Sequence, residues 1–189
     1  MLDRLLEVDK NLFIFLNSLG SDADDWFWKL ITIKYTWIPF FAFILFVLLK
    51  KMGWKQVLLV GFVLLVLITF TDQTTNLFKY HFQRLRPCNE PMLSAVIRVV
   101  QDSKSFSFFS GHASNSMATS VFLFSIMRRF SKYTVLLFVW PLVFGFSRIY
   151  LGLHYPLDVL CGYLWGSVWG LVAFQVFKLC QSKFFKDLI

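Results

Sequence analysis

One histidine in this sequence stands close to a carboxylate at a spacing that suits nucleophilic chemistry. His154 is followed by Pro156 and Asp158, and proline is well placed as the first residue of a helix, where its missing N–H is not needed. Asp158 would then lie one turn inside that helix, where its carboxylate could accept a hydrogen bond from one ring nitrogen of His154. Such a bond fixes the tautomer and leaves the other nitrogen free to attack.

A second histidine ends the tripeptide Ser110-Gly111-His112, at the start of an apolar segment. If a helix begins here, its unpaired backbone N–H groups and its dipole favour an anion, and a phosphate oxygen would fit. The alternative is an ordinary helix that starts with a serine cap and a hinge glycine. The third histidine, His81, has no carboxylate close in sequence and is interpreted as a packing residue.

Three cations accompany these histidines, namely Lys79, Arg86 and Arg148. A guanidinium matches two phosphate oxygens in a fork, and its burial near a membrane is costly unless an anion meets it. A phosphoryl group in transfer spreads negative charge over its non-bridging oxygens, so a cluster of fixed cations suits that reaction. The alternative is an ion pair between Arg148 and Asp158 that locks two helices together, which would leave both histidines without a role.

The sequence lacks the usual signatures of a metal or disulfide site. It contains no His-Glu-x-x-His segment, no calcium-binding loop and no cluster of carboxylates, so we expect neither a metal nor a cofactor. The three cysteines, Cys88, Cys161 and Cys180, are an odd number, and the last two lie in or beside an apolar segment. They are interpreted as small core residues.

The composition indicates a protein built for a lipid bilayer. Hydrophobic residues make up 57% of the chain and charged residues only 16%, whereas soluble domains average about 25% charged. The net charge of +8 is scattered between apolar segments and forms no stripe, which argues against a nucleic-acid partner. Five segments approach the roughly 20 residues needed to cross a bilayer, namely Tyr35–Leu49, Val57–Phe78, His112–Met127, Tyr133–Phe146 and Pro156–Leu179.

Residues 1–30 differ from the rest of the chain. Leucine and phenylalanine recur at roughly helical spacing among charged residues, followed by Gly20 and a cap at Ser21 or Asp22. This pattern predicts an amphipathic helix that lies at the membrane interface. The predicted fold class is therefore all-α: a single membrane-embedded domain over residues 1–189, with a bundle of about five transmembrane helices and this N-terminal interfacial helix.

Charge indicates how the bundle lies in the membrane, because short cytoplasmic loops accumulate lysine and arginine. The two longer polar segments, residues 79–111 and 147–155, would face outward. We therefore predict an integral protein of the bacterial inner membrane, with its chemistry facing the periplasm or the cell exterior. Nine bases should face the cytoplasm, namely Lys50, Lys51, Lys55, Arg128, Arg129, Lys132, Lys178, Lys183 and Lys186.

The candidate residues resemble the motifs of the type 2 phosphatidic acid phosphatase superfamily, which includes lipid phosphate phosphatases and, more distantly, vanadium haloperoxidases. The family's motifs are lysine followed after six residues by Arg-Pro, then Pro-Ser-Gly-His, then Ser-Arg with a downstream histidine and aspartate. They match residues 79–87, 109–112 and 147–158 in order and spacing. A chance match to the last motif in this chain is on the order of one in a thousand. Phe109 departs from the pattern, since it stands where the family has a proline that presets the turn.

The resemblance implies a role for each matching residue. His154 would attack phosphorus and form a phosphohistidine, and Asp158 would orient it. His112 would protonate the leaving oxygen and then activate water. The phosphate would be bound by Lys79, Arg86, Ser110, Gly111 and Arg148.

The resemblance also implies the reaction: metal-independent hydrolysis of a lipid phosphate or diphosphate at the outer face of the membrane. Phosphatidic acid, phosphatidylglycerophosphate and undecaprenyl diphosphate share the required headgroup chemistry, and the apolar residues do not separate their tails. The alternatives are a lipid A phosphatase, a vanadate-dependent oxidant, and a non-enzymatic lipid-binding or transport protein, for which broken motifs would be expected. Asp72, two helical turns before Lys79, either tunes that lysine or bonds to a neighbouring helix.

Overall fold

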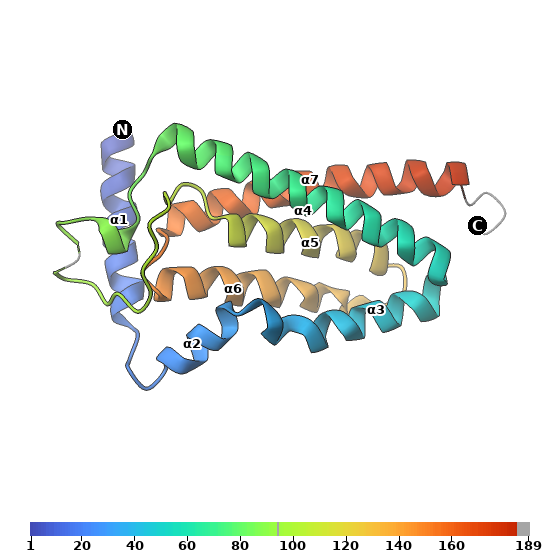
Figure 1. Ribbon diagram of the computed structural model, residues 1–189, viewed down its shortest axis with the longest axis horizontal. Coiled ribbons are helices and arrows are strands. Elements are labelled where there is room, and N and C mark those ends of the chain that lie inside the picture. The colour runs from blue at the N-terminus through green and yellow to red at the C-terminus, as the bar shows by residue number, and fades with distance from the viewer. Residues whose placement is uncertain (94, 185–189) are drawn as a thin grey trace.

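The protein is an elongated bundle of helices with one further helix lying across one end (Figure 1). The computed structural model describes residues 1–93 and 95–184, and every regular element within them is helical, which confirms the predicted all-α class. In chain order the elements are α1 (Leu2–Ser18), α2 (Asp25–Thr32), η1 (Lys34–Trp37), α3 (Ile38–Met52), α4 (Trp54–Phe82), η2 (Pro87–Asn89), α5 (Gly111–Met127), η3 (Lys132–Phe138), α6 (Val139–Tyr150) and α7 (Pro156–Phe184).

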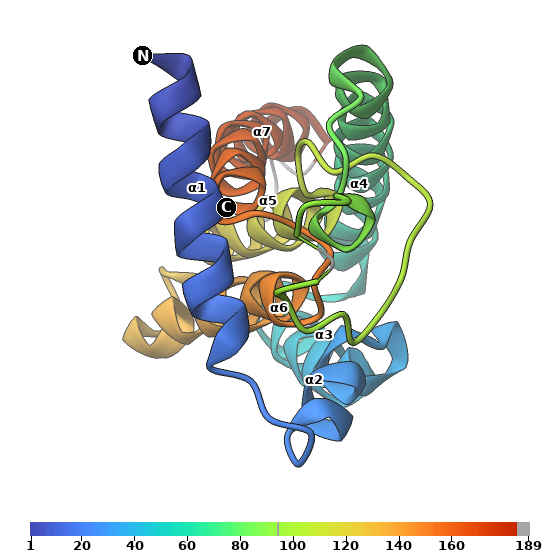
Figure 2. The same ribbon diagram turned by 90° about the vertical axis from the view of Figure 1, so that its left-hand side faces the viewer.

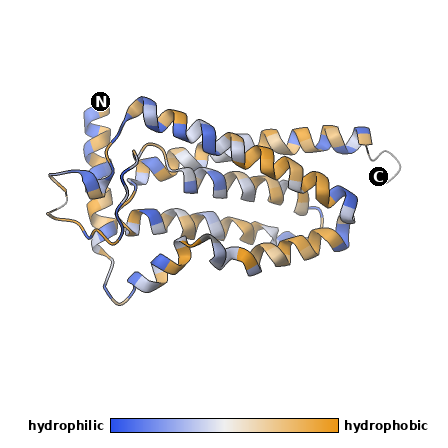
Figure 3. Ribbon diagram, viewed as in Figure 1, coloured by the Kyte–Doolittle hydropathy of each residue, from blue (hydrophilic) through white to orange (hydrophobic). Residues whose placement is uncertain are grey.

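Four of the five predicted segments form helices that are long and apolar enough to cross a membrane. The colouring by hydropathy shows apolar stretches along α3, α4 and α7, with hydrophilic residues toward the ends of the bundle (Figure 3). The remaining segment forms α5, whose 17 residues fall short of the roughly 20 that a full span needs. Most of its residues are buried, so α5 is a central helix enclosed by the others. The four long segments are Tyr35–Met52, Trp54–Asn89, Lys132–Tyr150 and Pro156–Phe184.

A stripe of three glycines on α7 brings that helix very close to α5. A Cβ atom at Gly162 would lie 2.7 Å from the carbonyl oxygen of Ser110, and one at Gly170 would lie 2.7 Å from that of Ala118. Gly166, between them, likewise faces the α5 backbone. Because only glycine permits such an approach, this small-residue stripe fixes how α7 lies along α5.

The observed starts of two helices can be compared with the starts that the sequence predicts. α7 begins at Pro156, as predicted. The predicted cap at Ser21 or Asp22 is wrong, because α2 begins after Asp24. The Ser21 hydroxyl instead donates a hydrogen bond of 2.6 Å to the Asp24 carboxylate, so it stabilises the turn that precedes the helix.

Helix α1 lies across the end of the bundle (Figures 1 and 2). Its inward face buries Asp9, Phe13 and Asn17, which are one turn apart, while the leucines of its outer face are exposed. The Asn17 side chain donates to the carbonyl oxygen of Tyr150 at 3.0 Å and accepts from the backbone N–H of Arg98 at 2.8 Å. An N-terminal amphipathic helix is thus present and firmly attached, and its place at the membrane interface stays a prediction.

The basic loops and the motif segments lie at opposite ends of the bundle. Figure 1 shows the α3–α4 turn, the α5–η3 connection and the end of α7 at one end. The α4–α5 loop and the start of α7 lie at the other, beside α1. This separation is what the charge argument requires, although Lys186 of the basic tail lies outside the described residues. Which end faces the cytoplasm stays a prediction.

Candidate active site

The segments that carry the three motifs meet at the end of the bundle crossed by α1 (Figures 1 and 2). Lys79 comes from the last turns of α4, His112 from the start of α5, and Arg148 from the end of α6. His112 interacts electrostatically with these two cations and with Arg86 and His154. Groups that are far apart in the sequence therefore face one common site.

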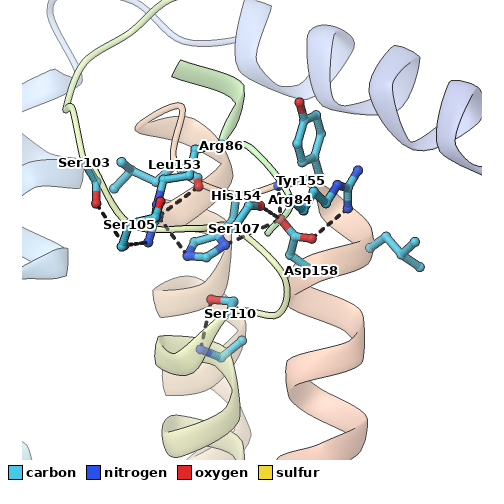
Figure 4. Close-up of polar contacts among 12 residues, drawn as sticks. Arg84, Arg86, Ser103, Ser105, Ser107, Ser110, Leu153, His154, Tyr155 and Asp158 are labelled. Carbon is cyan, nitrogen blue, oxygen red and sulfur yellow. Dashed lines mark hydrogen bonds and ion pairs between the residues drawn. The ribbon is translucent and has the colours of Figure 1, made fainter. Parts of the chain in front are cut away.

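His154 lies in the loop between α6 and α7 and is almost completely buried, with 1% of its surface exposed. Its backbone N–H donates to the carbonyl oxygen of Arg148 at 3.2 Å, which folds the loop back onto the end of α6. Its Nε2 lies 3.1 Å from a guanidinium nitrogen of Arg86 (Figure 4). Because a guanidinium can only donate, we assign Nε2 as the acceptor and place the ring proton on Nδ1. Burial and the charges of Arg86 and Arg148 lower the pKa of His154 well below its ordinary value, which favours the neutral, nucleophilic ring.

Asp158 lies beside the protonated side of this ring. Its Oδ2 is 3.5 Å from Nδ1 of His154, so the expected pairing is present as a close approach, and within the described residues Nδ1 has no hydrogen-bond partner. The same oxygen accepts from the backbone N–H of Tyr155 at 3.0 Å and from the hydroxyl of Ser107 (Figure 4). These bonds fix a fully buried carboxylate next to the imidazole.

Arg86 is held next to Nε2 of His154 by bonds to two loops. Its Nε donates to the carbonyl oxygen of Ser105 at 2.8 Å, and its terminal nitrogens donate to the hydroxyl of the same serine at 2.7 Å and to the carbonyl oxygen of Leu153 at 3.0 Å (Figure 4). The guanidinium therefore has a defined position before any anion arrives, which lowers the cost of binding one.

Arg148 is buried but only partly satisfied. It donates to the hydroxyl of Thr32 at the end of α2, and its Nε has no partner among residues 1–93 and 95–184. The alternative ion pair between Arg148 and Asp158 is wrong, because Asp158 pairs with Arg84 at 2.7 Å. A buried guanidinium with a donor to spare is suited to an anion.

The sequence allowed two interpretations of the start of α5, a serine-capped helix and an anion site, and the structure has features of both. The Ser110 hydroxyl caps the helix by accepting from the backbone N–H of Ala113 at 3.4 Å. The N–H of Ser110 itself donates to the carbonyl oxygen of Asp158 at 3.0 Å, which attaches this end of α5 to the first turn of α7. Gly111 and His112 follow and line a cavity. A capped helix start thus brings Gly111 and His112 to that space.

Phe109, which replaces the motif proline, is buried. Its ring packs against those of Phe78 and Trp165, with centroids 5.3 and 5.9 Å away. Aromatic packing against α4 and α7 therefore holds the loop before Ser110 in place, where the family motif relies on a proline.

A cavity of about 500 Å³, lined at one end by Lys79 and His112, extends along α4 and α5. Asp72, Lys79 and Asn115 place polar groups in it. Asp72 accepts a hydrogen bond from Asn76 of its own helix at 3.3 Å and interacts electrostatically with Lys79, which favours the tuning role over a bond to a neighbouring helix. The apolar wall includes Trp37, Phe41, Leu64, Ile68, Trp140 and Phe144.

Several contributing residues could not be recognised in the sequence. Arg84 occupies the spacer of the first motif, where any residue type is compatible with the pattern. Ser105 and Ser107 lie in a loop with several serines and no distinctive spacing. The available signal was that Arg84 is a charged residue within the spacer of the first motif, two residues before Arg86.

Comparison with known proteins identifies the family of this chain. The family model described as the PAP2 superfamily matches residues 56–182. A lipid A 4'-phosphatase of Bacteroides thetaiotaomicron is 34% identical over 99% of this chain and 84% of its own length. One from Porphyromonas gingivalis is 30% identical over 96% and 78%. The crystal structure of a transmembrane PAP2-type phosphatidylglycerolphosphate phosphatase from Bacillus subtilis has a TM-score of 0.67 at 21% identity, covering 96% of this chain and 88% of its own.

Proposed function

The chain belongs to the PAP2 superfamily, and from that premise we propose that it hydrolyses a phosphorylated membrane lipid through a phosphohistidine at His154. One observation carries the residue assignment. The Nε2 atom of a buried, neutral histidine lies 3.1 Å from Arg86, with the Asp158 carboxylate on the opposite side of the ring. A phosphate that accepts this Arg86 N–H in place of Nε2 would free the lone pair of the nucleophile and lie next to it.

The proposed reaction has two steps. In the first, Nε2 of His154 forms a bond to phosphorus, the bond from phosphorus to the lipid oxygen breaks, and His112 gives a proton to that oxygen. In the second, His112 takes a proton from water, the water oxygen attacks phosphorus, and the N–P bond breaks to release inorganic phosphate. Arg86, Arg148 and Lys79 stabilise the charge on the non-bridging oxygens. Since side chains fill every role, the proposed route needs no metal.

The cavity supports a glycolipid of the lipid A class as the substrate. Relatives that match this chain over nearly its whole length are named lipid A 4'-phosphatases, which favours the alternative that the sequence left open. Asp72 and Asn115 line the same cavity as Lys79 and His112, where they can bond to sugar hydroxyl and amide groups. The aromatic and aliphatic wall then suits acyl chains.

A substrate panel tests this proposal. The detergent-purified protein is given lipid A, phosphatidic acid, phosphatidylglycerophosphate, undecaprenyl diphosphate and a soluble aryl phosphate, with and without excess chelator, and phosphate release is measured. We expect lipid A to rank first in kcat/KM and the chelator to leave the rate within about twofold, because no step uses a metal.

The outcomes separate the parts of the proposal. A different lipid ranking first would keep the phosphatase and overturn the lipid A assignment. Loss of activity in chelator that returns on adding a divalent cation would overturn the metal-independent route. Absence of release from every lipid, by protein shown to be folded, would overturn the phosphatase itself.

The proposal places the site at the outer face of the bacterial inner membrane. It rests on the basic loops at the opposite end of the bundle (Figure 1). The exposed Lys104 lies in the α4–α5 loop at the end of the site, and the exposed Lys51 lies at the other end. These two residues therefore form a matched pair for labelling.

We expect a cysteine at position 104 to react with a membrane-impermeant thiol reagent in intact spheroplasts, because the proposed topology exposes it to the outside. Lys104→Cys and, as the control, Lys51→Cys are each made in a Cys88→Ser background and labelled before and after lysis. The Lys51→Cys protein should be labelled only after lysis. The reverse pattern would invert the topology.

A further inference from the structure

A carboxylate on α1 is joined to the active site through one arginine. Arg84 donates from one terminal nitrogen to Oδ1 of Asp158 at 2.7 Å and from the other to Oδ2 of Asp9 at 2.7 Å. Both carboxylates are buried, with side-chain exposures of 0% and 4%. Figure 4 shows the Arg84–Asp158 half of this bridge next to His154. The guanidinium fork thus connects the N-terminal helix to the carboxylate that faces the nucleophile.

Asp9 also holds the backbone at the start of α7. Its Oδ1 accepts from the N–H of Leu157 at 2.8 Å, one residue before Asp158. Arg84 in turn lies over the ring of Tyr155, 3.9 Å from its centroid. The bridge therefore fixes the first turn of α7, from which the Asp158 side chain extends to the histidine.

The charges of the bridge suggest what Asp9 contributes. If Asp158 were the only carboxylate bonded to Arg84, the guanidinium would neutralise its charge. Asp158 would then stabilise a positively charged imidazole only weakly. With Asp9 sharing Arg84, the three groups carry one net negative charge in a buried site. Asp158 thereby keeps the charge that stabilises His154 as phosphorylation makes the ring positive.

Building on the proposed phosphohistidine route, we propose that Asp9 is a positioning residue of the active site, acting through Arg84 on Asp158. It lies outside all three motifs and on the helix that crosses the end of the bundle. Asp9 bonds to Arg84 and to the backbone of Leu157, not to His154 or to the proposed phosphate-binding residues, so its effect should fall on the chemical step. Binding of the lipid, which depends on the cations and the cavity, should be spared.

The test is Asp9→Asn, which keeps the size of the side chain and removes its charge. We expect kcat for the lipid substrate to fall by about tenfold or more while KM changes by less than about twofold. The control is Glu7→Gln, an equal change at an exposed carboxylate of the same helix, which should keep the wild-type kcat. Thermal unfolding of each purified protein shows that the comparison is made between folded proteins.

A double-variant experiment separates positioning from general stabilisation. If Asp9 acts through Asp158, then Asp9→Asn should lower kcat by less than about twofold further in a protein that already carries Asp158→Asn. Equal losses in both backgrounds would overturn the proposal, as would an unchanged kcat in the single variant or a loss confined to KM.

A second variant keeps the proposal testable if the Asp9→Asn protein does not fold. Arg84→Lys keeps a cation, but a lysine ammonium lacks the fork that bonds two carboxylates at once. It should again lower kcat by about tenfold with KM nearly unchanged, and a wild-type kcat would overturn the proposal. The wild-type protein is assayed first in every series. If it releases no phosphate, the proposed function fails, whereas an active wild type with unaffected variants rejects the role of Asp9 alone.

Discussion

Replacing His154 by alanine is expected to abolish phosphate release while leaving the protein folded. The change removes the atom that is proposed to bond to phosphorus, and in other enzymes loss of a nucleophile costs on the order of 10⁴-fold or more in kcat. Folding should survive because the ring packs in a polar site, and its nitrogens bond to Arg86 and face Asp158 rather than filling an apolar core. The measurement is phosphate release from the best lipid substrate, with thermal unfolding as the check on the fold.

The intermediate provides a second readout for the same residue. Wild-type protein that is quenched during turnover of a radiolabelled substrate should carry phosphate that is stable in alkali and lost in acid, as expected for phosphohistidine, and the His154→Ala protein should carry none. The control is His81→Ala, which changes an exposed histidine at the same end of the bundle and should keep activity within about twofold. Comparable turnover by folded His154→Ala protein would reject the nucleophile.

Replacing His112 by alanine is expected to slow lipid hydrolysis by about 10²- to 10⁴-fold, because general acid and base catalysis contributes that much. The loss should depend on the leaving group. A lipid alkoxide needs a proton as it departs, whereas a nitrophenolate does not. With a nitrophenyl phosphate, the first step should survive and the second, in which His112 activates water, should become slow.

That difference can be seen before the steady state. On mixing His112→Ala protein with the nitrophenyl ester, we expect a burst of about one nitrophenolate per active site, followed by slow release of phosphate. The double variant His112→Ala/His154→Ala is the control and should show no burst. If His112→Ala loses the aryl and lipid reactions equally and shows no burst, then the residue acts in phosphate binding or earlier.

Local signals predicted much of this structure from the sequence. Pro156 marked the first residue of α7 because a proline at a helix start costs no hydrogen bond, and the Ser110 tripeptide marked the start of α5. The apolar segments could be recognised in the sequence because a helix that crosses a bilayer needs a long run of apolar residues. The enclosed position of α5 could not be predicted in the same way, because a short apolar segment has the same sequence pattern whether it lies in a protein core or in lipid.

The contacts that complete the site could not be predicted from such local signals. Asp9 and Arg84 are 75 positions apart in the chain and Arg84 and Asp158 are 74 apart, so no periodicity links them. Asp9 sits among other charged residues of α1, where a carboxylate ordinarily faces water. Arg148 likewise found its partner on α2 instead of α7. Such pairings follow from how helices pack, which spacing within one helix does not reveal.

The glycine stripe of α7 bears on how enzymes of this kind can change their substrates. It joins α7 to α5 backbone against backbone, so the packing of these two helices does not depend on the bulky side chains that line the cavity. Those side chains come largely from η1, α3, α4 and α6. Substitutions there can reshape the space for a lipid tail while α5 and α7, which carry His112 and Asp158, keep their relative alignment. The architecture thus allows the choice of lipid to diverge across descendants of one ancestor without rebuilding the chemistry.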